Sequence, residues 1–170
     1  MVPAEEATPM DTALILLDAA LVGGLAVWMT LAVSDNWRHP KMNEEAVRMV
    51  SQLDLLEQEF PEDFAQISYR RITDPRHVRL MFRTIRLAET VAAVALWGSV
   101  IALALAAFGA APLDGATGAA VLATGFFSLI WGGFIIGGNY FAYWYCHAWA
   151  QSNHFMFMYW GLFVLVILLL

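Results

Sequence analysis

The residues best suited to chemistry in this sequence lie at the edges of its apolar stretches. His147 and His154 are seven residues apart across a predicted turn, and Asp18 and Glu89 fall inside apolar stretches. Histidines on facing helices can ligate haem iron, and an ionisable group inside a membrane helix often marks an ion pathway. Solvated interfacial histidines and snorkelling or paired carboxylates are commoner. We therefore expect no catalytic residue, no metal site and no cofactor, so the protein is not expected to be an enzyme.

A polar cluster is nevertheless predicted around Glu89. Its expected members are Arg86, Glu89, Asn139 and Tyr140. Glu89 and Asn139 should lie at similar depth on neighbouring helices, where a hydrogen bond can join them. Arg86, three residues before Glu89, offers a simpler partner on the same helix. Asp18 either snorkels to the nearer interface or meets a partner helix or an ion.

Composition indicates a membrane protein. Of 170 residues, 60% are hydrophobic and 14% are charged, and the mean hydropathy is +0.61. Soluble domains are about half apolar and a quarter charged. The net charge of −6 argues against a nucleic-acid partner. Cys146 is the only cysteine, which excludes an intrachain disulfide, a cysteine-based zinc site and an iron–sulfur cluster built by this chain alone.

Four apolar stretches are predicted to span the membrane, at residues 12–33, 85–108, 118–140 and 154–170, because about 20 apolar residues cross a bilayer core. The N-terminus lacks the basic region of a signal peptide, so the first span should be retained. The prediction is one domain, 1–170, of an all-α membrane protein. It is an up-down four-helix transmembrane bundle with an amphipathic helical loop, 34–84, between spans one and two.

The loop carries its apolar residues at helical spacing. They are Ala46, Met49, Val50, Leu53, Leu56 and Phe60. Asn43 is the expected N-cap and Pro61 the expected end, with a second short helix from Glu62. This amphipathic helix either lies on the membrane surface or offers a docking face to another protein.

Basic residues and aromatics mark the loop side of the bundle. All nine Lys and Arg fall between Arg38 and Arg86. A collar of arginines precedes the second span and is suited to anionic lipid headgroups, unless it serves only as a topology signal: Arg76, Arg79, Arg83 and Arg86. The expected interfacial aromatics are Trp37, Trp144, Trp149 and Trp160. The positive-inside rule then places the long loop in the cytoplasm and both termini outside.

Glycines supply smooth faces for helix packing. The candidates, several at small-xxx-small spacing, are Gly23, Gly24, Gly132, Gly133, Gly137 and Gly138. Such faces let helices approach closely where no water drives them together.

Two segments resemble a family of small four-span bacterial integral membrane proteins catalogued as a domain of unknown function. Residues that match its pattern in the first segment are Arg70, Ile72, Thr73, Pro75 and Glu89. Those in the second are Gly137, Gly138, Phe141, Trp144 and Trp149. The chain departs from the pattern at Asn139, where the family has an acid, and at Tyr140, where it has tryptophan. The resemblance implies a fold and no activity.

Three functions are open at this point. The favoured one is a non-catalytic accessory subunit of a larger membrane complex, in respiratory or photosynthetic electron transport, that aids packing, assembly, lipid binding or the shaping of a quinone channel. Its partners would be that complex and phospholipids. The alternative is a small homo-oligomeric transporter or channel, for which a polar pathway between Asp18 and Glu89 is not evident. A redox or metal protein is the third.

Overall fold

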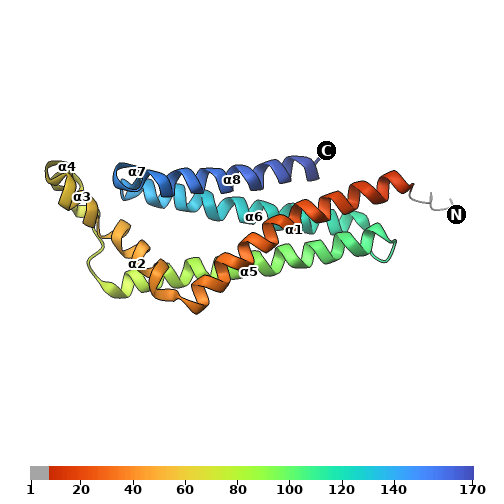
Figure 1. Ribbon diagram of the computed structural model, residues 1–170, viewed down its shortest axis with the longest axis horizontal. Helices are drawn as coiled ribbons and strands as arrows, with labels where there is room; N and C mark the ends of the chain where they lie inside the picture. Colours follow the sequence, from red (N-terminus) through yellow and green to blue (C-terminus); the bar gives the residue numbers. More distant parts are fainter. Residues whose placement is uncertain (1–7) are drawn as a thin grey trace.

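The structure is a bundle of long helices with a smaller helical segment at one end (Figure 1). This computed structural model describes residues 8–170, so the acidic N-terminus weighed above as a signal peptide lies mostly outside the described residues. Four helices are long and apolar enough to cross a membrane: α1 (Pro9–Arg38), α5 (Pro75–Ala107), α6 (Leu113–Tyr140) and α8 (Ala148–Leu168). No strand occurs in residues 8–170. The predicted all-α membrane bundle is confirmed.

The starts of α1 and α5 follow directly from the sequence. The Thr8 hydroxyl caps α1 by accepting from the Asp11 amide, and the Thr8 amide donates to the Asp11 carboxylate. Pro9 follows at the first helical position. Asp74 caps α5, where its Oδ1 accepts a hydrogen bond from the Arg76 amide at 2.8 Å. A side-chain cap satisfies an otherwise free amide, and proline is preorganised for the first turn.

The four helices pack in the order α1, α5, α6, α8, and α1 meets α8 through a smaller contact. Their core is apolar, with Leu25 and Met29 of α1, Leu96 of α5 and Phe127 of α6 fully buried. The start of α1, the turn at 108–112 and the C-terminal end of α8 lie at one end of the bundle (Figure 1). The extramembrane helices lie at the other end.

The glycines divide into those that meet a neighbour and those that do not. Cβ atoms added at Gly24 and Gly132 would lie 3.4 Å from Trp160 and 3.9 Å from Met158. Gly23 similarly faces Val100 at 3.9 Å. At Gly133 and Gly137, an added Cβ would meet no atom of the described chain within 4 Å. These two glycines therefore make no close helix contact within a single copy.

The tightest packing falls partly elsewhere. An added Cβ at Gly138 would lie 2.7 Å from the Tyr143 ring. One at Gly161 of α8, which the sequence analysis did not single out, would lie 2.8 Å from Phe127 Cδ1 and would collide with Ser128 Oγ. Gly161 has no small residue four positions away in either direction, so no spacing pattern marks it.

The loop between α1 and α5 contains three short helices and a 3₁₀ turn. They are α2 (Pro40–Ser51), α3 (Asp54–Glu59), α4 (Pro61–Ile67) and η1 (Ser68–Arg70). The single amphipathic helix expected from Asn43 to Phe60 is wrong in two respects. It begins at Pro40, so Asn43 is not its cap, and it breaks at Leu53, whose φ is +57°. That break turns Leu53 into a small apolar cluster with Leu56 and Phe141.

Two boundaries also differ from the sequence prediction. The connection left between the second and third predicted spans, residues 109–117, is shorter in the structure, since α6 already begins at Leu113. The segment after α6 contains a separate short helix, α7 (Tyr143–Cys146), which follows Ala142 at φ +50°. A non-glycine residue at positive φ is uncommon and reverses the chain direction sharply.

Candidate functional site

Glu89 is the most deeply buried acid in the described part of the chain, at 4% exposure on α5. Its Oε2 accepts a hydrogen bond from the side-chain amide of Asn36 on α1. The Oδ1 of Asn36 in turn accepts from the Asn43 amide on α2 at 2.5 Å. A buried carboxyl group is strongly unfavourable unless it is hydrogen-bonded. The Asn43–Asn36–Glu89 chain, here called the amide relay, provides that partner and ties three helices together.

The expected hydrogen bond between Glu89 and Asn139 is wrong. Asn139 lies on α6 and accepts from Gln151 Nε2 of α8 at 3.0 Å. The reason is that α1 continues five residues beyond the predicted span end at Val33, to Arg38. This extension carries Asn36 alongside α5. The polar pair Asp35-Asn36 at the end of the first apolar stretch was the available sequence signal.

Arg86 also has a different partner from the one expected. Its Cζ lies 3.9 Å from the centre of the Trp37 ring, and no ion pair joins it to Glu89 within residues 8–170. Trp37 is held from the other side because its Nε1 donates to Thr90 Oγ1 at 3.2 Å. A guanidinium over an indole face is a favourable cation–π contact.

Tyr140 belongs to a second polar group. Arg70 donates from Nη1 to the Tyr140 carbonyl at 3.0 Å, and its Cζ lies 5.3 Å from the centre of the Tyr140 ring. The predicted four-residue polar cluster is therefore divided. Arg86 and Glu89 lie with α1 and α5, whereas Asn139 and Tyr140 lie where α6 ends.

The arginine collar is largely open to its surroundings. Arg76, Arg79 and Arg83 are exposed along the first turns of α5, and none forms an ion pair with a described acid. Arg86 is half-buried by its contact with Trp37. Beside the collar, an open groove of about 360 Å³ runs between α2 and the start of α5, with Lys41 and Arg48 in its lining alongside Glu44 and Glu45.

The expected interfacial tryptophans lie on the surface. Trp37, Trp144 and Trp149 are exposed at the loop end of the bundle. Trp160 is also exposed, but it lies twelve residues after the start of α8 and its ring faces Gly24 in the middle of α1, so its assignment to the interfacial aromatics is wrong.

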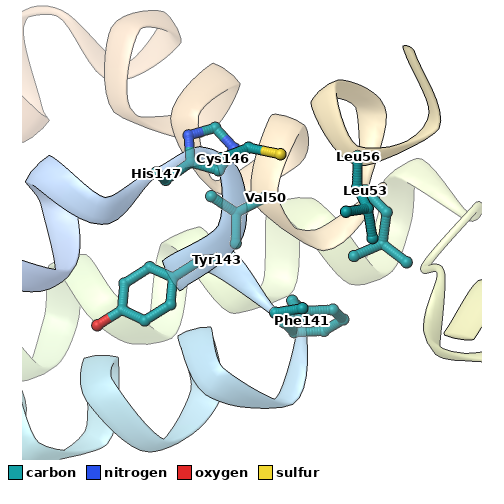
Figure 2. A pocket seen from close by; sticks show the side chains of 8 residues that line it. Val50, Leu53, Leu56, Phe141, Tyr143, Cys146 and His147 are labelled. Atoms are coloured by element: carbon teal, nitrogen blue, oxygen red, sulfur yellow. The ribbon is translucent and has the colours of Figure 1, made fainter. Parts of the chain in front are cut away.

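A small cavity lies between the α2–α3 segment and α7, but it has no room for a substrate. Its volume is about 10 Å³, enough for no more than one water molecule. Figure 2 shows its lining side chains, which include Leu53, Leu56, Phe141, Cys146 and His147. Burial raises the pKa of Cys146, and the charge of Glu59 raises it further. Cys146 is therefore a protonated thiol and a poor nucleophile at neutral pH.

His147, beside Cys146, is mainly neutral. Burial lowers its pKa, while the charge of Glu59 opposes that shift. Residues 8–170 contain no group of three or more His, Cys, Asp and Glu side chains arranged to hold a metal ion.

Four long apolar helices, an apolar core and polar groups gathered at one end define a multi-pass α-helical integral membrane protein. The chain belongs to the family described as predicted small integral membrane protein (DUF2165), whose model matches residues 14–170. The family suspected from the sequence motifs is confirmed. No curated protein and no solved structure matches the chain.

Proposed function

We propose that this protein is a non-catalytic accessory subunit of a larger membrane complex, and that α8 is its docking helix. The observation that carries this proposal is the exposure of α8. In the 18-residue apolar stretch of each helix, only 17% of the residues of α8 are buried within the chain, against 39% for α5 and for α6. A helix that contributes so little to the core of its own bundle has most of its surface free to contact a second protein.

The exposed residues of α8 also differ in kind from those of α6. The outward stripe of α8 contains Met156, Tyr159 and Phe163, while that of α6 contains Leu122, Leu129 and Ile136. Aromatic residues and methionine are enriched in protein interfaces. The aliphatic side chains of the α6 stripe, in contrast, are suited to contact with lipid tails. The α8 stripe is therefore the better candidate for contact with protein.

The interior of the bundle supports a packing role more than a transport role. Its buried core contains hydrophobic side chains along its whole length. Ser99, Thr124 and Ser128 are buried mid-bundle. The hydroxyls of Ser99 and Ser128 donate to carbonyls of their own helices, and that of Thr124 has no partner in residues 8–170, so these hydroxyls form no continuous path. A channel needs polar groups along a path. The favoured complexes remain those of respiratory or photosynthetic electron transport in a bacterial inner membrane.

Lipid binding is the second part of this role. Arg76, Arg79 and Arg83 present three cations at the end of a spanning helix, and none has an ion-pair partner among residues 8–170. Each contributes about 1 kcal/mol of attraction to anionic lipid there. Replacing all three by glutamine should reduce the anionic phospholipid that co-purifies, as measured by mass spectrometry. Arg48→Gln is the control, because Arg48 of α2 is already paired with Glu45 and Asp54. Equal lipid content in both variants would contradict this part.

The direct test is affinity purification of the tagged protein from native membranes in mild detergent, followed by mass spectrometry. We expect stoichiometric subunits of a larger enzyme. Phe163→Ala on α8, where Phe163 is 71% exposed, should weaken that association, whereas Leu122→Ala on α6, where Leu122 is 76% exposed, should not. Recovery alone or as a homo-oligomer would contradict the accessory role. The homo-oligomeric transporter would then be tested by flux in liposomes.

A further inference from the structure

Three buried polar atoms that have no hydrogen-bond partner in the described chain, residues 8–170, belong to one aromatic cluster between α6, α7 and α8. They are Nε1 of Trp131, the hydroxyl of Tyr143 and Nδ1 of His154. Trp131 is 5% exposed and Tyr143 is 2% exposed. Buried polar groups are nearly always paired, and a group left unpaired destabilises the fold. Two such residues in contact with the same histidine therefore call for a functional reason.

Three aromatic rings surround the His154 imidazole at angles of 19° to 30° to its plane. The His154 imidazole is 4.8 Å from Phe134 at 29°, 5.6 Å from Trp131 at 30° and 5.9 Å from Tyr143 at 19°, measured between ring centres. Phe157 extends the cluster, 4.9 Å from Trp131. The environment of His154 is thus built from flat faces.

Backbone geometry fixes the outer wall of the cluster. The Tyr143 ring rests on Gly138, where an added Cβ would lie only 2.7 Å from the ring. Ala142, at φ +50°, turns the chain to put it there. Figure 2 shows the Tyr143 ring pointing away from Leu53 and Leu56, out of the small cavity. A residue held in the left-handed region marks a position that the surrounding structure must enforce.

The hydrogen-bonding groups and rings of the cluster match one kind of ligand. An indole N–H can only donate, a phenol O–H can donate, and a neutral imidazole donates from Nδ1 in one of its two tautomers, so acceptor oxygens match all three groups. Among its five members, Trp131, Phe134, Tyr143, His154 and Phe157, there is no permanently charged side chain. This excludes a phosphate headgroup as the preferred occupant. Flat faces favour a flat ring.

The depth of the cluster indicates where the ligand comes from. Trp131 lies nine residues before the end of α6 at Tyr140, which corresponds to about 13 Å along the helix. We propose that Trp131, Tyr143 and His154 form a binding site for a neutral planar ring with carbonyl oxygens, of the quinone class, that reaches it from the bilayer.

The site is closed in this structure, so a ligand can enter only if Tyr143 moves. Such a movement would let Ala142 leave its left-handed φ, which relieves the backbone strain that accompanies the contact of Tyr143 with Gly138. Tyr143 stands on α7, a helix of four residues, whereas Trp131 and His154 stand on spanning helices. When α7 moves, the Tyr143 ring leaves one face of the His154 imidazole, and the flat ring of the ligand can take its place there. The carbonyl oxygens then accept from the indole and the imidazole, and the phenol closes over the ligand and donates to one of the same oxygens.

Binding can be measured on the purified protein in nanodiscs by equilibrium dialysis against a decyl-substituted benzoquinone. The native chain should bind saturably. Trp131→Phe and Tyr143→Phe keep a ring and remove a donor, so each should weaken binding about fivefold to thirtyfold. Trp97→Phe is the matched control because it removes an indole N–H outside the cluster, one that donates to Thr30 Oγ1 at 2.9 Å. Its affinity should equal that of the native chain.

The melting temperature measured without ligand distinguishes a substitution that weakens binding from one that destabilises the fold. Removing an unpaired buried donor should leave it unchanged or raise it, so the two cluster variants should lose affinity without losing stability. Unsaturable uptake equal to that of empty nanodiscs, equal affinity in all variants, or lower stability with unchanged affinity would each overturn the proposal. If Trp131→Phe does not fold, Tyr143→Phe alone decides. The assay uses the isolated protein, so its failure leaves the accessory role untouched.

Discussion

Glu89 illustrates how a single carboxyl group is tolerated inside this bundle. Asn36 donates to it, and Asn43 donates to Asn36. No arginine or lysine takes part, so the amide relay needs an acceptor oxygen at residue 89 and does not need a negative charge. That distinction can be tested with conservative substitutions.

Glu89→Gln should retain most of the stability, because the glutamine carbonyl can still accept from Asn36. Glu89→Ala should lower the free energy of unfolding by about 2–4 kcal/mol, since it leaves a cavity and an unpaired amide. Both are measured by denaturation in detergent micelles. A glutamine variant as unstable as the alanine variant would mean that the charge itself is required.

Gly161 carries a second residue-level prediction. Gly161→Ala places a methyl group 2.8 Å from Phe127 Cδ1, and overpacking of this kind costs about 1–3 kcal/mol. Gly133→Ala, which meets no neighbour within 4 Å, is the control and should be neutral or slightly stabilising. Equal melting temperatures for the two variants would show that α6 and α8 pack less tightly than described.

At the scale of elements, the loop helices are fastened to the end of α6 and to α7. Tyr145 of α7 donates its hydroxyl to Asp63 of α4 at 2.7 Å, and its ring packs edge-on against Phe60 at 4.7 Å. Arg70 adds the contact with the Tyr140 carbonyl. The fastening is exposed to solvent, so it should open locally before the bundle unfolds.

Tyr145→Phe should therefore speed hydrogen–deuterium exchange in α4 while changing the global unfolding free energy by less than about 1 kcal/mol. Tyr159→Phe, on the exposed side of α8, is the control and should leave exchange in α4 unaltered. Unchanged exchange in the Tyr145 variant would show that the packing of Phe60 alone holds α4 in place.

The helices of this protein could be predicted from the sequence in part. Hydropathy and length were enough to predict four spanning helices, and periodicity was enough to predict an amphipathic segment between the first two. The break at Leu53 and the turn at Ala142 could not be predicted, because neither residue is a turn former. Both adopt positive φ only because tertiary packing of their neighbours requires it. The Asn36–Glu89 pair was missed because it depends on how far α1 continues beyond its apolar core.

At the scale of the whole molecule, the loop helices lie at one end and the turn at 108–112 at the other (Figure 1). The basic residues all accompany the loop, which predicts that the loop faces the cytoplasm.

Cysteine labelling in intact cells tests this orientation in a Cys146→Ser background. A membrane-impermeant maleimide should modify Phe108→Cys and should not modify Met42→Cys until the membrane is opened, since both side chains are well exposed. The reverse pattern would place the loop outside.

The position of the amide relay has a consequence for how the protein is made. Asn36, Asn43 and Glu89 all belong to the part of the chain that ends with α5. A ribosome that has completed this first hairpin has therefore already supplied every partner that Glu89 needs. The acid can enter the lipid phase in a satisfied state before α6 and α8 have been synthesised, and insertion can proceed in two separate steps.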